Sequence, residues 1–381
     1  MPDAVWYSFC VRSGVAPLRH GIRRCGAGAS AQPSTRTLAM QLHVRRLPPD
    51  ATVTVDAPAR LHLGFLDPNA SLGRAFGSVG LVIDGGGTRI EARLAERDQI
   101  DGALTEAERE RIAICLARLH AAYDPTPVAI EVIRTPRAHT GLGSGTQLAL
   151  AVGVAFVRLL DHSATPAELA VLLARGARSG IGVLGFEAGG LLVDGGPAKG
   201  LHSSLPPLLA RQPFPESWRV LLVSDTARVG LHGEAERRGL AALAPFPQAL
   251  AAHLCHLVLM QILPGAAEAD IVPFARGLTQ LQQTIGEYFA PVQGGVFASP
   301  DVERALRAVA AQCTAGIGQS SWGPTGFAIV ASEYDAACAL AAARDATRGM
   351  PHIECTVVAG RNRGAEVRRA ALRAQRRAHA V

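Results

Sequence analysis

The chain is poor in lysine and in cysteine motifs, and each shortage excludes a class of function. Of its 381 residues, 38 are lysine or arginine, yet Lys199 is the single lysine. A pyridoxal phosphate enzyme forms its Schiff base on a lysine, so that chemistry would depend on Lys199, which lies in a Pro-Ala-Lys-Gly turn. The seven cysteines are odd in number and lack Cys-x-x-Cys spacing. The sequence therefore predicts a reduced, cytoplasmic protein without a zinc site.

Long apolar runs and a basic surface are also missing. No uninterrupted apolar run approaches the roughly 20 residues that span a bilayer, so no membrane partner is predicted. Residues 1–39 hold five Arg against one Asp, and residues 361–381 hold seven Arg against one Glu. These ends contribute +4 and +6 to a formal net charge of +6, so the middle of the chain is negative. This distribution does not indicate a basic nucleic-acid surface on the folded body.

A glycine-rich segment between a strand pattern and a helix pattern dominates the first half of the chain. Val128, Ile130 and Val132 alternate as in a strand, and Leu148 begins the apolar spacing of a helix. Backbone N–H groups at a helix N-terminus lack intrahelical partners and favour anions. The segment does not match the Walker pattern, because no lysine is near. We therefore predict a phosphate or pyrophosphate site at Gly141, Gly143, Ser144, Gly145 and Thr146.

Residues 53–65 predict a strand with two faces. Leu61, Leu63 and Phe65 alternate with Arg60, His62 and Gly64, so a cation and an imidazole share one side. From the pattern alone, a functional face and a solvated face are equally compatible with this arrangement. The short strand 78–84 ends at Asp84 and three glycines, and residues 88–94 are predicted to be its hairpin partner.

Capping boxes, prolines and composition predict where helices start and where domains end in the rest of the chain. Thr105 to Glu108 and Thr165 to Glu168 predict helix starts. A proline-rich stretch at 206–215 predicts a domain boundary, followed by an α+β layer. Met40 precedes the first patterned segment, so the preceding residues are expected to be disordered or to follow an upstream start. The predicted organisation is an extension (1–39), an N-terminal domain (40–205), a C-terminal domain (216–360) and an Arg-rich tail (361–381), helical or disordered.

Five segments together resemble the β-ribofuranosylaminobenzene 5′-phosphate synthase family of the GHMP kinase superfamily. They are Pro58 to Asp67, residues 139–147, Ser179-Gly180-Ile181-Gly182, residues 186–196 and Gln319-Ser-Ser-Trp-Gly-Pro-Thr325. The resemblance implies a two-domain GHMP-kinase-like α+β fold and a homodimer. It also implies condensation of 4-aminobenzoate or 4-hydroxybenzoate with 5-phosphoribosyl 1-pyrophosphate. This reaction releases CO₂ and pyrophosphate in tetrahydromethanopterin biosynthesis.

The resemblance also suggests roles for individual residues. Arg60 would orient the substrate carboxylate, and His62, His139 and Glu187 are further catalytic candidates. Residues 320–325 would add phosphate contacts through Ser320, Ser321, Gly323 and Thr325. Mg²⁺ is the implied cofactor, and its candidate ligands are Asp84, Glu187 and Asp194, each on or beside a glycine turn.

Two other classes of function stay open. An ATP-dependent small-molecule kinase would use the same fold and loop, but the bulky Trp322 and Pro324 are expected to crowd a nucleotide phosphate path. A binding or sensor protein derived from an enzyme is the second alternative, and the intact glycines and acids at each motif disfavour it.

Overall fold

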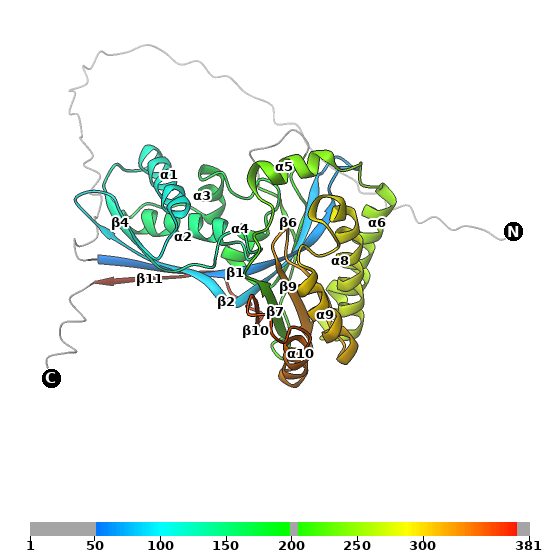
Figure 1. The fold of residues 1–381 in the computed structure, drawn as a ribbon. Helices are drawn as coiled ribbons and strands as arrows, with labels where there is room; N and C mark the ends of the chain where they lie inside the picture. Colours follow the sequence, from blue (N-terminus) through cyan, green and yellow to red (C-terminus); the bar gives the residue numbers. More distant parts are fainter. Residues whose placement is uncertain (1–50, 199–204, 372–381) are drawn as a thin grey trace, which may run out of the picture. The chain divides into compact units, whose positions relative to one another are not determined.

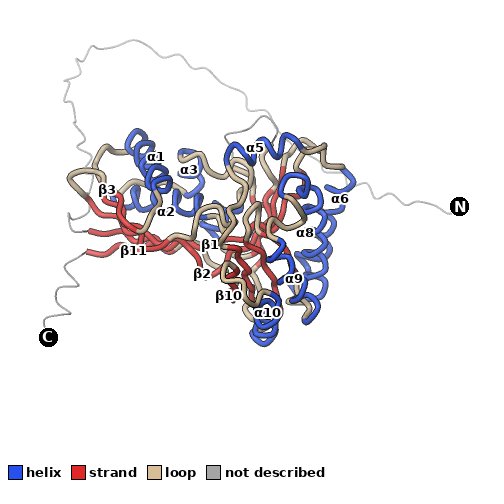
Figure 2. The backbone as a smooth tube through the Cα atoms, in the orientation of Figure 1, coloured by secondary structure: helices blue, strands red, loops and turns tan. Residues whose placement is uncertain are grey.

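A computed structural model of the chain describes residues 51–198 and 205–371. The predictions for residues 1–39, Lys199 and residues 372–381 lie outside this part of the chain. Within it, two β-sheets are each covered by helices, which is the predicted α+β arrangement (Figures 1 and 2).

The first sheet has seven strands in the order β11-β1-β2-β4-β3, with β5 paired to β2 and β6 paired to β5. They are β1 (Ala51–Asp67), β2 (Phe76–Leu94), β3 (Gln99–Gly102), β4 (Val128–Arg134), β5 (Leu191–Asp194), β6 (Leu208–Gln212) and β11 (Glu366–Ala371). The helices α1 (Glu106–Ala122), α2 (Ser144–Leu159), α3 (Pro166–Leu172) and α4 (Ile181–Ala188) lie together above this sheet in Figure 1. Leu148, Val152 and Phe156 of α2 are buried against it, as the helical spacing predicts.

Both predicted capping boxes are present. The Thr105 hydroxyl accepts a hydrogen bond from the backbone N–H of Glu108 at the start of α1, and the Glu108 carboxylate accepts one from the backbone N–H of Thr105. Thr165 and Glu168 form the same pair at the start of α3. Each box provides partners for backbone donors that the first helical turn leaves unpaired, so these two helix starts follow from local sequence alone.

The predicted hairpin between residues 78–84 and 88–94 is wrong, because both segments belong to the single strand β2. Gly85 and Gly86 adopt φ values of +88° and +61°, and the pairing of β2 with β1 shifts register between Ala57 and Ala59. A β-carbon on Gly87 would lie 2.4 Å from the Ala57 carbonyl oxygen. The glycines therefore form an irregular bend at which β2 stays paired with β1, instead of a turn.

The second sheet is antiparallel in the order β10-β7-β9-β8. Its strands are β7 (Arg219–Asp225), β8 (Gly316–Gln319), β9 (Thr325–Val330) and β10 (Ile353–Ala359). Leu221 and Val223 of β7 pack with α9 (Pro300–Gln312) and α10 (Glu333–Ala346), whereas Val220 and Leu222 join the cluster around α8 (Ile271–Gln293). Helices therefore cover both faces of this sheet. β8 is a short buried Gly-Ile-Gly-Gln segment without polar and apolar alternation, so it was not predicted from the sequence.

The segment Gln248–Glu268 comprises α6 (Gln248–Leu257), the π-helix η1 (Val258–Ile262) and α7 (Leu263–Glu268). By length and composition it is long and apolar enough to cross a membrane, the one such helix among the described residues. Leu254, Leu257 and Ile262 are buried in the core around α8. The remaining helix, α5 (Gly233–Ala242), was not anticipated from the sequence.

The C-terminal tail returns to the first sheet. The expectation of a helix or disorder is wrong for Glu366–Ala371, which forms β11 antiparallel to β1. The long strand β1 offers its free edge here, and pairing satisfies backbone groups that would otherwise be open. The stretch predicted as a domain boundary contains β6, which pairs with β5. One apolar cluster is shared by the two sheets and includes residues of the first sheet (Leu61, Leu81) and of the second (Leu222, Phe327).

Candidate active site

The glycine-rich loop between β4 and α2 ends in an uncapped helix N-terminus. Gly143 is the N-cap of α2 with φ +82°, and no side chain caps this helix. The Gly143 carbonyl accepts hydrogen bonds from the backbone N–H groups of Thr146 and Gln147 at 3.1 and 3.2 Å. The preceding N–H groups of Ser144 and Gly145 lie in the first turn, where an α-helix supplies no carbonyl partner. This geometry suits an anion.

The loop is fixed to both sheets through Gly141. The Gly141 carbonyl accepts hydrogen bonds from Arg60 Nη1 at 2.5 Å and from Ser320 Oγ at 2.7 Å. Ser320 Oγ in turn accepts a hydrogen bond from the backbone N–H of His62 at 2.9 Å. A β-carbon on Gly141, whose φ is +93°, would lie 2.3 Å from the Ser320 carbonyl oxygen. Ser320 is fully buried and therefore holds the loop in place.

Of the other predicted phosphate contacts at residues 321–325, two are packed inside the protein and one is exposed. Gly323 packs so closely on Thr140 that a β-carbon would lie 2.3 Å from the Thr140 backbone, and Thr325 is buried beside Ser224, 3.0 Å between hydroxyl oxygens. Ser321 is the exposed member, with φ +56°, and its N–H donates to the His62 carbonyl. Only the Ser321 side chain is open to a ligand in this motif.

Two arginines that the sequence analysis did not single out lie beside the first turn of α2. Arg111 and Arg175 line a small pocket together with Gly145, enclosing about 220 Å³ of empty space that includes open solvent. A β-carbon on Gly145 would lie 4.0 Å from Arg175 Nη1. Arg175 Nε has no hydrogen-bond partner, and burial lowers the pKa of this side chain. The arginines come from α1 and from the α3–α4 connection, so no sequence spacing places them here.

Arg60 and His62 share one face of β1, as the alternation predicts. Burial lowers the pKa of Arg60 to about 10, so it stays charged at neutral pH, and its Nε has no hydrogen-bond partner. Burial, then the charges of Arg60 and Arg178, lower the pKa of His62 to about 3. His62 is therefore a neutral imidazole at physiological pH, and its Nε2 atom also lacks a partner.

His139 lies at the start of the loop and is a second neutral histidine. Its ring stacks on His232 with 3.6 Å between ring centroids, and its Nε2 lies 2.9 Å from Arg111 Nη2. Burial, followed by the charges of His232 and Arg111, lowers the pKa of His139 to about 4. Because Arg111 can only donate, His139 Nε2 accepts this hydrogen bond.

The three acids predicted to bind Mg²⁺ do not form one site. Asp194 is fully buried, and its carboxylate accepts hydrogen bonds from Gly180 N at 2.9 Å, Gly196 N at 2.8 Å and Ser179 Oγ at 3.2 Å. Burial raises the pKa of this carboxyl group. Asp194 therefore fixes the glycine-rich turns around α4.

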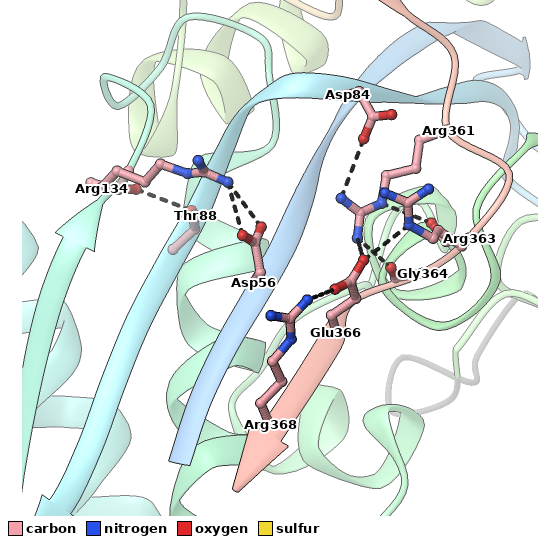
Figure 3. A network of polar contacts seen from close by, with 10 residues as sticks. Asp56, Asp84, Thr88, Arg134, Arg361, Arg363, Gly364, Glu366 and Arg368 are labelled. Atoms are coloured by element: carbon pink, nitrogen blue, oxygen red, sulfur yellow. Dashed lines mark hydrogen bonds and ion pairs between the residues drawn. The ribbon is translucent and has the colours of Figure 1, made fainter. Parts of the chain in front are cut away.

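Asp84 and Glu187 lie elsewhere. β2 pairs with Asp194 through Ser78, six residues before Asp84, which corresponds to about 20 Å along a strand. Asp84 forms an ion pair with Arg361 at 3.3 Å, in the polar network shown in Figure 3. Glu187 is exposed on α4. These positions do not bring the three candidate ligands together around one Mg²⁺ ion.

The one group of possible metal ligands among residues 51–198 and 205–371 is Asp225, Asp301 and His352. Asp225 accepts a hydrogen bond from Ser299 at 2.7 Å and lies 3.3 Å from Arg228, and His352 lies 3.0 Å from Asp301. The group thus has protein partners already, and none of its members was a predicted site residue.

Comparison with known proteins identifies related chains. Family models described as GHMP kinases N terminal domain and GHMP kinases C terminal match residues 110–190 and 262–348. The β-ribofuranosylphenol 5′-phosphate synthase of Archaeoglobus fulgidus is 35% identical, over 81% of this chain and 97% of that protein. The protein of the same name from Methanothermobacter thermautotrophicus is 30% identical, over 82% and 97%.

Solved structures share the fold at low identity. Mevalonate diphosphate decarboxylase from Staphylococcus aureus aligns with a TM-score of 0.59 at 13% identity, covering 83% of this chain and 98% of that chain. Homoserine kinase from Cytophaga hutchinsonii aligns with a TM-score of 0.56 at 17% identity, covering 83% and 97%. The predicted GHMP-kinase-like fold is therefore confirmed.

Proposed function

The chain belongs to the β-ribofuranosylphenol 5′-phosphate synthase family, and from this premise we propose that it joins 4-hydroxybenzoate or 4-aminobenzoate to 5-phosphoribosyl 1-pyrophosphate. The bond from ribose C1 to pyrophosphate oxygen breaks, and its electron pair leaves with the pyrophosphate. The ring carbon that bears the carboxylate bonds to C1. The ring–carboxylate bond then breaks, returns its electron pair to the ring and releases CO₂. The enzyme is thus a decarboxylating phosphoribosyltransferase of tetrahydromethanopterin biosynthesis.

The uncapped N-terminus of α2 beside Arg60, Arg111 and Arg175 carries this proposal. Departure of pyrophosphate needs its developing charge neutralised, and preorganised N–H donors with arginines supply this stabilisation. Arg60 and Arg175 each retain an Nε–H without a protein acceptor. Leaving such buried donors unpaired costs free energy, so an anion that accepts from them gains affinity.

We infer that the histidines act through hydrogen bonds and carry no obligatory proton transfer. An acid that enters as its carboxylate needs no obligatory proton transfer, because CO₂ takes no proton with it. The lowered pKa values of His62 and His139 keep both rings neutral, which suits hydrogen bonding more than proton donation near pH 7. Arg60 remains the candidate to orient the carboxylate.

The residues present do not fit a protein-bound Mg²⁺ site at the loop, because Asp84, Glu187 and Asp194 do not converge. We therefore derive no step through the metal. A Mg²⁺ requirement stays a prediction, with the ion arriving on the substrate pyrophosphate, since Mg²⁺ binds readily to phosphate oxygens and water.

We also propose that the protein acts as a cytoplasmic homodimer on small-molecule substrates. Phosphoribosyl pyrophosphate is a metabolite of the cell interior, which is the reason for this location. Light scattering on a size-exclusion column tests the assembly, and a monomeric mass at assay concentration contradicts it.

Carboxyl-labelled 4-aminobenzoate tests the reaction directly. The protein is incubated with the labelled acid, phosphoribosyl pyrophosphate and Mg²⁺, and released CO₂ is counted. Release is expected with phosphoribosyl pyrophosphate and not with ATP. ADP formation from ATP with a small alcohol, without CO₂ release, would favour the alternative of a GHMP small-molecule kinase.

Arginine variants test the site within the same assay. Arg175→Ala is expected to raise KM for phosphoribosyl pyrophosphate about tenfold or more, because a charged hydrogen bond contributes about 1.5–3 kcal/mol. The control is Arg118→Ala, which removes an exposed arginine from α1. Equal effects of the two variants would remove Arg175 from the anion site.

A further inference from the structure

A cavity lies between β1 of the first sheet, α8 and the β8–β9 turn, and this turn contacts the glycine-rich loop through Ser320 and Gly141. The cavity contains about 390 Å³ of empty space, counting open solvent at its mouth. Its walls are mainly apolar and aromatic: His62, Phe65, Ile285, Phe289, Val296 and Trp322. The Phe289 and Trp322 rings are 4.5 Å apart between centroids. Small-molecule pockets have this composition, with few polar groups that fix orientation.

Three glutamines on the wall already have protein partners. Gln282 Nε2 donates to the Leu63 carbonyl at 2.5 Å, and its Oε1 accepts from the Gln319 backbone N–H at 2.7 Å. Gln319 Oε1 accepts from the Ala298 N–H at 2.6 Å, and its Nε2 donates to Gln293 Oε1 at 3.2 Å. These amides hold the wall in shape and are occupied.

His62 offers the cavity a hydrogen-bond acceptor. It is 4% exposed, lines the cavity, and its Nε2 has no partner. In the neutral ring one nitrogen carries the proton and the other a lone pair, and with the proton on Nδ1 the Nε2 atom presents its lone pair to the cavity. A neutral acceptor suits an O–H or N–H donor and does not suit a carboxylate.

Arg60 provides a charged hydrogen-bond donor, in contrast to the neutral acceptor of His62, and lies two residues earlier on the same face of β1, about 6.6 Å along the strand. It is cationic, and it lies at the loop through its bond to the Gly141 carbonyl. Its Nε and His62 Nε2 are both buried and unpaired. One strand face therefore presents a cation toward the loop and a neutral acceptor toward the cavity. This pair matches a flat ligand with an anionic end and a neutral donor end.

We propose that this cavity is the aromatic-acid subsite, with the ring against the Phe289–Trp322 pair, the carboxylate toward Arg60, and the para hydroxyl or amino group donating to His62 Nε2. The assignment rests on the proposed function and deepens it by naming the residues that select the acid. The orientation places the carboxylate-bearing carbon toward the loop that receives pyrophosphate.

The same hydrogen bond assists the reaction. When ribose C1 bonds to the ring, positive charge develops on the ring and is shared by the para oxygen or nitrogen. A neutral acceptor at the para hydrogen stabilises that charge as it forms, and it stays a hydrogen bond because the proton need not leave. His62 is thus a substrate-binding residue whose interaction strengthens in the transition state.

Ligand discrimination tests the role of His62. Binding of 4-hydroxybenzoate and of benzoate, which lacks the para donor, is measured by calorimetry or by the change in intrinsic tryptophan fluorescence in the presence of pyrophosphate. The wild-type chain is expected to prefer 4-hydroxybenzoate at least tenfold, and His62→Ala is expected to abolish the preference while leaving pyrophosphate affinity unchanged. A preference retained in a folded His62→Ala protein overturns the assignment.

Filling the cavity tests its location independently. Val296→Phe, on the loop after α8, is expected to raise KM for the acid at least tenfold without changing KM for phosphoribosyl pyrophosphate. The matched control, Val272→Phe, places the same ring at a position on α8 that is 51% exposed and is expected to change neither constant. Equal KM values for the acid in both folded variants refute the subsite.

The two proposals fail in distinguishable ways. CO₂ release by the wild-type chain, with both cavity variants unaffected, supports the reaction and refutes the subsite. Binding of 4-hydroxybenzoate that depends on His62 and Val296, without CO₂ release, supports the subsite and refutes the reaction.

Discussion

Gly145→Ala separates a loop that binds an anion from a loop that only connects β4 to α2. Substitutions at Gly141 and Gly143 cannot separate the two cases, because each residue has a positive φ and an added β-carbon would crowd the protein itself. The β-carbon would lie 2.3 Å from the Ser320 carbonyl oxygen at Gly141 and 3.1 Å from Arg60 at Gly143. Gly145 has helical backbone in α2, and its β-carbon would meet only Arg175, at 4.0 Å. Any penalty at Gly145 thus comes from a ligand.

The expected magnitudes have opposite signs for stability and for activity. Replacing glycine by alanine inside a helix raises the free energy of unfolding by about 0.5–1 kcal/mol, so the melting temperature should stay the same or rise by about 2 °C. The same methyl group projects into the pocket with Arg111 and Arg175, where pyrophosphate would lie. Disturbing one preorganised donor costs about 3 kcal/mol in comparable anion sites, or roughly a hundredfold in kcat/KM for phosphoribosyl pyrophosphate.

The assay combines steady-state kinetics for each substrate with a melting curve on the same sample. Gly153→Ala is the control further along α2, where the new methyl group would contact Leu173 at 3.1 Å, away from the loop. It should change stability alone. An unchanged kcat/KM for phosphoribosyl pyrophosphate in a folded Gly145→Ala protein would refute the anion-binding role of the α2 N-terminus.

Three further predictions concern single residues. The pKa of His62 is about 3 in the folded state and about 6.5 in the unfolded state, so the unfolded state binds the proton first and the free energy of unfolding falls as the pH drops below about 6.5. His62→Gln should therefore remove about 2 kcal/mol of the stability loss between pH 7 and pH 5, measured by urea titration. An unaltered loss in this variant contradicts the burial of a neutral His62. Asp84→Asn should leave the Mg²⁺ concentration dependence of turnover unchanged while weakening the contact to Arg361; a shifted metal titration would restore Asp84 as a ligand. Lys199→Ala should retain turnover without pyridoxal phosphate, and an inactive but folded variant would disprove this expectation.

The sequence by itself determined the elements whose signals are local. The boxes at Thr105 and Thr165 start helices because a side chain and a backbone group three residues apart satisfy each other. The loop ending at Gly143 and the two-sided strand carrying Arg60 and His62 were likewise predictable from glycine placement and period-two alternation. These rules involve neighbours in the chain, and at these positions tertiary packing left their outcome unchanged, whereas at Gly85–Gly87 pairing with β1 replaced the expected turn.

Only the tertiary structure decided which distant groups meet. Arg175 joins the loop from the α3–α4 connection, and Ser320 reaches Gly141 across 179 positions in the sequence. Asp84 and Asp194 were both candidate Mg²⁺ ligands because they adjoin glycine turns, but the β2–β5 register separates them and the Asp194 carboxylate accepts hydrogen bonds from backbone N–H groups. Contacts of this kind depend on strand register and helix packing, which no local spacing encodes.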